Sequence, residues 1–233
     1  MLSLIAFIIG TVLGSFALWL AQQLIQGKVD WCARSRCATC QRVLKWWDLI
    51  PIFSQLRLHS RCRYCHTKLP AYYWISELSA GLLAALWYVH LGKNLTHPLQ
   101  LIYGIQFVLL LTMCWCDYFT YIIPDRLQLC LLSLCLYLTS TQNQWQWQLL
   151  MSSWLVGLLL ILYFLRPNWL GGADVKLLAL LLPTIPFQMH AYFIGGSTLI
   201  GFIYYLVTRR WHSPLPFIPC IALSYYGVLL FLT

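Results

Sequence analysis

Two aspartates stand beside apolar segments with neighbours that suit catalysis. Asp117 ends one long apolar run, and Asp174 follows Gly171 and Gly172 at the start of another. The two glycines would let a substrate backbone approach Asp174 closely. Two carboxylates that lie close together cannot both ionise easily, so they can share one proton. Such a pair can activate water and protonate a departing amine, as in aspartic proteases. Isolated aspartates at helix ends are the alternative interpretation.

The other four of the six acidic residues have simpler interpretations. Asp125 follows Pro124 before a helical run, where a carboxylate would cap exposed amides and complement the helix dipole. Asp30 and Asp48 lie in a polar segment, and we expect them to be solvated or to cap turns. Glu77 lies within a predicted membrane span, where an ionisable side chain is costly and therefore indicates a function. Pairing of Glu77 with an arginine or a buried hydroxyl is the structural alternative.

Four of the ten cysteines have the spacing of metal ligands. Cys37, Cys40, Cys62 and Cys65 form two C-x-x-C pairs with 21 residues between them. This pattern is typical of a tetrahedral structural zinc site, and a reducing compartment disfavours the disulfide or redox alternative. Zinc would stabilise a polar insert that is too small to build its own core, without itself carrying catalysis. We interpret the other cysteines as apolar packing residues.

The elements that must position these residues are membrane helices. Of the 233 residues, 61% are hydrophobic and 9% are charged, and the mean hydropathy is +0.71. A soluble globular domain is nearer half apolar and a quarter charged. Eight spans of about 20 residues would use about 160 residues. The 44-residue polar segment 27–70 takes most of the remainder, which excludes a second soluble domain of ordinary size.

We therefore predict an all-α, polytopic membrane protein with about eight transmembrane helices and one cytoplasmic insert. Its expected parts are a first transmembrane helix over 1–26, a zinc-binding loop over 27–70 and a catalytic helical bundle over 71–233. Two prolines within 177–208 indicate a turn or a broken helix there, so a re-entrant pair is the alternative to two crossings. The predicted spans are Leu2–Ile25, Ala71–Leu91, Leu99–Cys116, Leu127–Ser140, Leu149–Leu165, Val175–Phe187, His190–Thr208 and Leu215–Leu232.

The net charge of +9 serves as a marker of topology. Nine of the fifteen Lys and Arg residues lie in the polar insert, and basic residues beside spans mark the cytoplasmic side. With the insert inside, the gaps that face inward hold 14 of the 15 basic residues, and Lys93 is the exception. Both termini are then expected outside. A basic loop beside a membrane can also contact anionic lipid, whereas nucleic-acid binding is not expected. We discern no internal repeat.

Taken in order, the motifs resemble those of the type IV prepilin peptidases, a family of membrane aspartic proteases. Gly14-Ser15-Phe16 is similar to an early signature of the family, and Ser35–Glu77 is similar to its cytoplasmic zinc loop. Asp117, followed seven residues later by Pro124-Asp125, resembles the first catalytic motif. Gly171–Lys176 resembles the second motif, which reads glycine-x-glycine-aspartate. The resemblance covers most of the chain.

The resemblance implies that the chain cleaves the short basic leader of a prepilin or pseudopilin on the cytoplasmic side of a bacterial plasma membrane. The apolar helix of that substrate would lie in the bilayer. Many family members also methylate the new N-terminus with S-adenosylmethionine, and Glu77 and the zinc loop are where we would look for that activity. The small size suggests the compact form found in competence systems of Gram-positive bacteria. The implied catalytic pair is Asp117 and Asp174, supported by Asp125, Gly171, Gly172, Lys176 and Glu77.

Two departures from the family pattern are visible. Ala173 replaces the usual second glycine, and we expect this to be tolerated if the backbone keeps a negative φ. Ala17–Leu20 lacks the asparagine that often follows the first signature. The alternative function, from another class, is a non-enzymatic zinc-loop scaffold or assembly protein. A transporter would place ionisable residues near the midplane, whereas these aspartates are predicted to lie at one membrane face.

Overall fold

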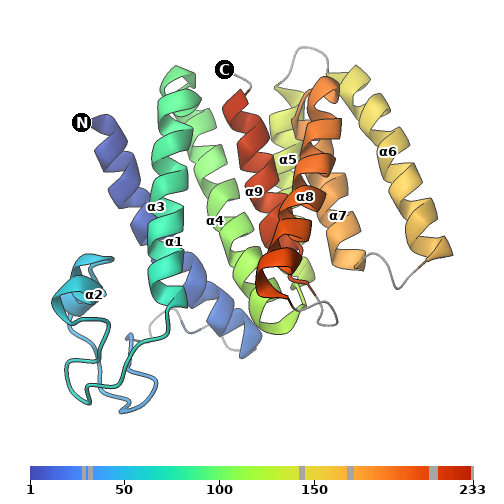
Figure 1. The fold of residues 1–233 in the computed structure, drawn as a ribbon. Coiled ribbons are helices and arrows are strands. Elements are labelled where there is room, and N and C mark those ends of the chain that lie inside the picture. The colour runs from blue at the N-terminus through green and yellow to red at the C-terminus, as the bar shows by residue number, and fades with distance from the viewer. Residues whose placement is uncertain (28–29, 31–33, 142–144, 167–170, 210–214, 232–233) are drawn as a thin grey trace. The chain divides into compact units, whose positions relative to one another are not determined.

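The computed structural model describes residues 1–27, 30, 34–141, 145–166, 171–209 and 215–231. Within these residues every regular element is helical, which confirms the all-α class, and β structure is limited to two isolated bridges (Figure 1). Each of the eight predicted apolar runs overlaps a helix, but the run Val175–Phe187 is α-helical only to Leu181. These helices are α1 (Leu2–Ile25), α3 (Tyr72–His90), α4 (His97–Thr120), α5 (Asp125–Ser140), α6 (Trp145–Leu165), α7 (Gly172–Leu181), α8 (His190–Thr208) and α9 (Ile218–Phe231).

Short helices make up the remaining regular structure. A five-residue helix, α2, lies in the polar insert, and three-residue or four-residue 3-10 turns flank the longer helices. Their bounds are Phe53–Arg57 for α2, Trp46–Leu49 for η1, Gly92–Asn94 for η2, Leu182–Thr184 for η3 and Phe187–Met189 for η4.

Within the described residues, four helical segments are long and apolar enough to cross a membrane: α1, α4, α6 and the segment Phe187–Thr208, which joins η4 to α8. The count of eight spans stays a prediction. With 10 residues, α7 is about 15 Å long, which is half of a bilayer core of about 30 Å. The charge count behind the topology includes Lys28 and Arg210, which lie outside the described residues.

The chain forms two compact units, Met1–Asn94 and Leu95–Thr233. In the first unit, α1 and α3 pack side by side through small residues (Figure 1). A Cβ atom on Gly14 would lie 2.5 Å from the carbonyl oxygen of Ser76 and 2.6 Å from the Cβ of Ala80. Gly10 and Gly14 form a G-x-x-x-G pattern, which allows two membrane helices to approach closely. The predicted boundaries near residues 26 and 70 stay predictions.

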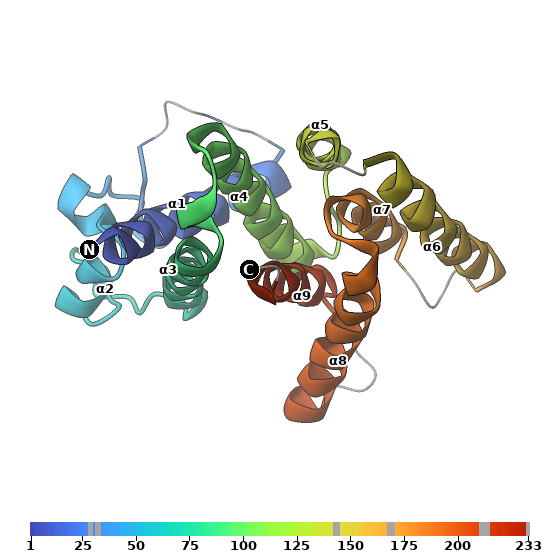
Figure 2. The ribbon, with the colours of Figure 1, turned by 90° about the horizontal axis from the view of Figure 1, so that it is seen from above.

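The second unit is built around α9, which packs against α4 and α8 (Figure 2). Polar groups lie within its apolar core: the amide nitrogen of Gln106 donates to the hydroxyl of Tyr225 at 3.1 Å. The same hydroxyl lies 2.9 Å from the hydroxyl of Thr184 in η3. A buried network of this kind joins α4, α9 and η3, and its polar groups would be costly to leave without partners.

The prolines of the segment 177–208 produce the break that the sequence predicts. Helix α7 ends at Leu181, and Pro183 lies in η3. The side chain of His190 lies against this break, since its Nε2 lies 2.9 Å from the oxygen of Leu182 and 3.2 Å from that of Ile185. The turn between α7 and α8 is therefore an ordered segment that is held by its own hydrogen bonds.

Candidate functional site

Asp117 lies in the last turn of α4 and is 7% exposed. Its Oδ2 accepts a hydrogen bond of 3.0 Å from the backbone N–H of Ile218, the first residue of α9. The first N–H groups of a helix lack partners within the helix, and its dipole favours negative charge at this end. The start of α9 therefore holds the carboxylate of Asp117 in place, across a sequence separation of 101 residues.

Asp174 lies in the first turn of α7, with Gly171 at the N-cap. The backbone N–H of Gly171 donates to its carboxylate, which satisfies one of the free amides of this helix end. A Cβ on Gly171 would lie 2.7 Å from Oδ2 of Asp174, and a Cβ on Gly172 would lie 3.3 Å from the hydroxyl of Tyr163. Neither glycine has a positive φ, so backbone conformation does not require them. The close approach of the Asp174 carboxylate and of the Tyr163 hydroxyl explains why these positions lack a side chain.

The charge of one predicted catalytic side chain, Asp117, acts on the other, Asp174. Burial, and secondarily the negative charge of Asp117, raise the pKa of Asp174 to about 6. The buried thiol of Cys220, in the first turn of α9, lies within range of the charges of both carboxylates. A pair in which one carboxylate raises the pKa of the other can hold a single proton between them. The sequence provided no signal for Cys220, which it left among the packing residues.

Two residues of the supporting set form an ion pair. Nζ of Lys176 in α7 lies 2.9 Å from Oδ1 of Asp125 in α5, and both side chains are largely exposed. An exposed pair contributes at most about 1 kcal/mol, so its effect is local orientation of α5 and α7. Asp125 lies in the first turn of α5, where its charge complements the helix dipole as predicted, but its carboxylate pairs with Lys176 and forms no cap on the helix amides among the described residues. Ala173 is helical with a negative φ, which meets the condition set for tolerance of its methyl group.

The four predicted zinc ligands come together in the first unit. The Sγ atoms of Cys37, Cys40, Cys62 and Cys65 all lie within 4.8 Å of one another. Zinc–sulfur bonds of about 2.3 Å in a tetrahedron place neighbouring sulfurs about 3.8 Å apart. Sγ of Cys37 lies 3.8 Å from Sγ of Cys65, so the donor set and its spacing fit zinc.

The expectation that the chain has no internal repeat is wrong at this loop. Ser35–Leu44 and Ser60–Leu69 share the pattern Ser-Arg-Cys-x-x-Cys-x-x-x-Leu. Both copies are closed by equivalent hydrogen bonds, from the N–H of the final leucine to the carbonyl of the first serine, at 2.8 Å and 2.7 Å. The residue after the second cysteine has φ of 57° in each copy. Two copies of one short turn therefore build the cluster.

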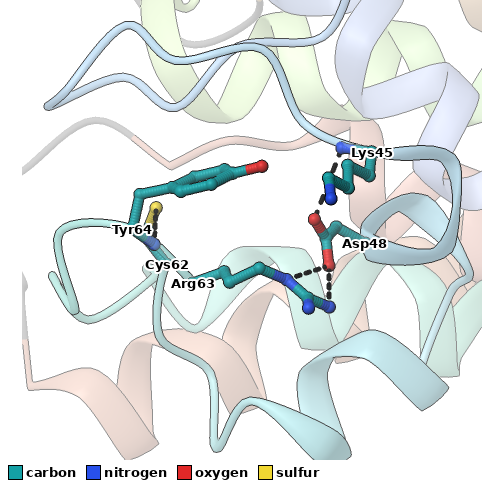
Figure 3. A network of polar contacts seen from close by, with 5 residues as sticks. All are labelled: Lys45, Asp48, Cys62, Arg63 and Tyr64. Atoms are coloured by element: carbon teal, nitrogen blue, oxygen red, sulfur yellow. Dashed lines mark hydrogen bonds and ion pairs between the residues drawn. The ribbon is translucent and has the colours of Figure 1, made fainter.

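Asp48 connects the second cysteine turn to η1 (Figure 3). Its Oδ1 accepts from Nε of Arg63 at 2.9 Å, and its Oδ2 accepts from the backbone N–H of Lys45 at 3.3 Å. The side chain of Asp48 is only 2% exposed, so the expectation of a solvated carboxylate is wrong, while the expectation of a cap is confirmed. The guanidinium of Arg42 lies 5.4 Å from the ring centroid of Tyr64 and joins the two turns.

Glu77, in α3, is 5% exposed and accepts three hydrogen bonds. Its Oε2 accepts from the backbone N–H of Ile52 at 2.7 Å and from Nε2 of Gln55 at 2.6 Å. Its Oε1 accepts from the hydroxyl of Ser15 in α1 at 3.3 Å. The carboxylate thereby ties the insert to α1 and α3, which extends the predicted pairing with a hydroxyl. Sequence reasoning missed both donors from the insert. The only signal for Gln55 was its polar side chain, and the backbone N–H of Ile52 had none.

Comparison with known proteins gives matches over both units. Residues 8–91 match the bacterial peptidase A24 N-terminal domain, and residues 102–206 match the type IV leader peptidase family. A "Prepilin leader peptidase/N-methyltransferase" of Bacillus subtilis is 30% identical over 226 residues, which cover 94% of this chain and 90% of that protein. A protein of the same name from Vibrio cholerae is 28% identical over 206 residues, which cover 82% of this chain and 79% of that protein.

A third relative, the "Type 4 prepilin-like proteins leader peptide-processing enzyme" of Escherichia coli, is 29% identical over 92% of this chain and 88% of its own length. No solved structure matches the chain. The match covers 90% of the Bacillus relative, and the two ranges matched by family models contain the four predicted zinc ligands and both predicted catalytic aspartates. The chain belongs to the type IV leader peptidase family.

Proposed function

We propose that this chain is a membrane peptidase that removes the leader of type IV prepilins or pseudopilins by an aspartic mechanism. Its family and the names of relatives that match nearly its full length support prepilin processing. They do not favour the alternative of a non-enzymatic scaffold. One observation carries the aspartic mechanism: Asp117 and Asp174 are electrostatically coupled carboxylates at the end of α4 and the start of α7.

The surroundings of the two carboxylates support different roles for them. Both carboxylates accept a backbone N–H at the start of a helix, but the negative charge of Asp117 raises the pKa of Asp174, so we assign Asp117 the role of base. Asp174, whose pKa is raised, holds the proton. Asp117 takes a proton from water, the oxygen of that water bonds to the scissile carbonyl carbon, and Asp174 protonates the departing amine as the C–N bond breaks.

The proposal extends to the surroundings of the pair. Asp125 and Lys176 orient α5 against α7, and Gly171 and Gly172 leave room at the carboxylate of Asp174. The four cysteines would hold a structural zinc ion, and zinc would supply folding energy to the loop without taking part in cleavage. We place the enzyme in the bacterial plasma membrane, with the leader cleaved on the cytoplasmic side.

N-methylation of the new N-terminus is the second activity that we propose, because relatives carry that activity in their names. S-adenosylmethionine would be the methyl donor. Cleavage and methylation have separate readouts, since the mass of the mature pilin reports both the cut site and the added methyl groups.

The decisive test is the pair of substitutions Asp117→Asn and Asp174→Asn, assayed on prepilin substrates in membranes and in purified form. Each should lower the rate of leader removal by at least about 100-fold, because each removes one of the two acid–base groups. Asp30→Asn, an exposed aspartate in the insert, is the matched control and should cleave normally. Processing at the wild-type rate by either variant would rule out the aspartic pair.

A further inference from the structure

The zinc loop contains an open cavity that neither the cleavage site nor the metal site uses. Its volume is about 580 Å³, and it lies beside Cys62. Five basic side chains line it, and no acidic residue does: the five are Arg57, His59, Arg61, Arg63 and His66. Their positions alternate along the chain from 57 to 63, so the segment presents one basic side chain at every second residue.

Most of this charge is uncompensated. Among the described residues, only Arg63 of the five takes part in an ion pair, with Asp48. No ion pair or side-chain hydrogen bond involves Arg57, Arg61 or the two histidines in that part of the chain. Arg57 and Arg61 thus bring two guanidinium charges to one cavity without a carboxylate among the described residues to offset them, and this arrangement favours a bound anion.

The backbone that carries these side chains is held in a strained conformation. His59 and Ser60 are consecutive non-glycine residues in the left-handed region, with φ of 49° and 53°. Such strain persists only where surrounding contacts impose it, and it is concentrated at functional sites. The N–H of Ser60 donates to the carbonyl of Gln55 at 2.8 Å, and the indole N–H of Trp74 donates to the hydroxyl of Ser60.

The bond from Trp74 also ties the cavity to the first turn of α3, where Trp74 lies. That turn reads Tyr72-Tyr73-Trp74, and aromatic residues of this kind lie at the level of lipid headgroups. A cavity anchored there is within reach of the phosphate groups of a bilayer.

We propose that this cavity binds a phosphate group, which an anionic lipid headgroup or a free phosphate ion can supply. Arginine matches phosphate geometry through its planar fork of N–H donors, and the histidine rings add further donors. Lipid bound in this way would hold the zinc loop against the membrane surface. Binding would use the cavity of the first unit alone, and it requires no step of the cleavage reaction.

The test uses the full-length protein, stripped of lipid in an uncharged detergent. Bound phosphatidylglycerol and phosphatidylcholine are measured by native mass spectrometry, and inorganic phosphate is measured by calorimetry. Arg57→Gln combined with Arg61→Gln removes two exposed cavity charges. Arg34→Gln combined with Arg36→Gln is the matched control, because it removes the same charge from exposed residues of the loop outside the cavity. Zinc content and the thermal midpoint verify that each variant is folded.

We expect the cavity variant to bind phosphatidylglycerol about 25-fold more weakly than the wild type, with the control near the wild type. A comparable selective loss for inorganic phosphate alone would support the cavity with a soluble anion as its ligand. Equal losses in both double variants, or no loss in either, would overturn the proposal. If the double variant loses zinc, Arg57→Gln alone gives the same decision, with an expected loss of about fivefold.

Discussion

At the scale of residues, the chemistry of the two aspartates depends on backbone amides at helix starts, and the amide that binds Asp117 lies 101 residues away in the chain. Asp117 receives the N–H of Ile218, and Asp174 receives that of Gly171. Both contacts place a carboxylate at the positive end of a helix, α9 in one case and α7 in the other. Each aspartate is therefore oriented by a rigid element, as acid–base catalysis requires.

Gly171→Ala tests how closely Asp174 must be positioned. Its Cβ would lie 2.7 Å from Oδ2 of Asp174, so the carboxylate must move. Because misplacement by about 1 Å can cost about 100-fold in rate, we expect kcat/KM for leader cleavage to fall by about 10-fold to 100-fold. Gly157→Ala in α6, where a Cβ would meet no atom within 4 Å, is the control. A Gly171→Ala enzyme with wild-type kcat/KM would contradict this explanation of the glycine.

The pH dependence of cleavage follows from the raised pKa of Asp174, which is about 6. As the pH rises through that value the pair loses its proton, both carboxylates become charged, and no acid remains for the departing amine. At lower pH a second proton binds and the base is lost. We therefore expect kcat/KM to pass through a maximum, with limits that belong to the pair as a unit. A rate that does not change from acidic to neutral pH is incompatible with a shared proton.

At the scale of elements, the polar insert contains two copies of one cysteine turn and is secured to the helices by Glu77. Each copy places two cysteines at the cluster, and Asp48 joins the second copy to η1. The insert contributes few large buried side chains, since Cys37 and Cys62 are its buried hydrophobic residues among those described. A metal centre is therefore the expected source of its stability.

Cys37→Ser and Cys62→Ser should each abolish zinc binding and loosen the loop, because a structural zinc site supplies much of the folding energy of a small insert. The readouts are metal content, which should fall from about one zinc per chain to near zero, and trypsin cleavage within the basic insert, which should accelerate. Cys130→Ser, at an exposed position on α5 outside the cluster, is the control. Full zinc content in Cys62→Ser would exclude the tetrathiolate site.

At the scale of the whole molecule, two membrane topologies make different predictions for the turn between α7 and α8. Four segments qualify as spans by length and composition, and α7 is half the length of a bilayer core. In one topology α7 and α8 each cross the membrane, and in the other they form a re-entrant pair. Both topologies leave Lys176 and Arg209 on the same side. Only the side from which the turn between α7 and α8 is reached distinguishes them.

Gln188→Cys places a thiol at an exposed position of η4 in this turn. Eight crossings predict that a membrane-impermeant maleimide labels it from outside in intact spheroplasts, above the labelling of the parent chain. Lys93→Cys should be labelled in the same way, because the loop around Lys93 is predicted to face outward. Protection of Gln188→Cys alongside labelled Lys93→Cys would instead establish the re-entrant pair.

The sequence by itself determined the elements and the chemistry they carry. Apolar runs predicted every long helix, because the cost of exposing a backbone in a membrane makes span length a local property of the chain. The spacing of Cys37, Cys40, Cys62 and Cys65 predicted their cluster, because metal ligation constrains ligand type and separation. The two glycines that precede Asp174 identified it as a candidate catalytic residue, because they would let a substrate backbone approach its carboxylate.

Only the tertiary structure decided which distant groups complete these sites. The N–H of Ile218 on Asp117, the amides of Ile52 and Gln55 on Glu77, and the pairing of Asp125 with Lys176 all join residues far apart in the chain. Such contacts depend on how helices pack, and no local pattern encodes the partner of a hydrogen bond formed across a bundle.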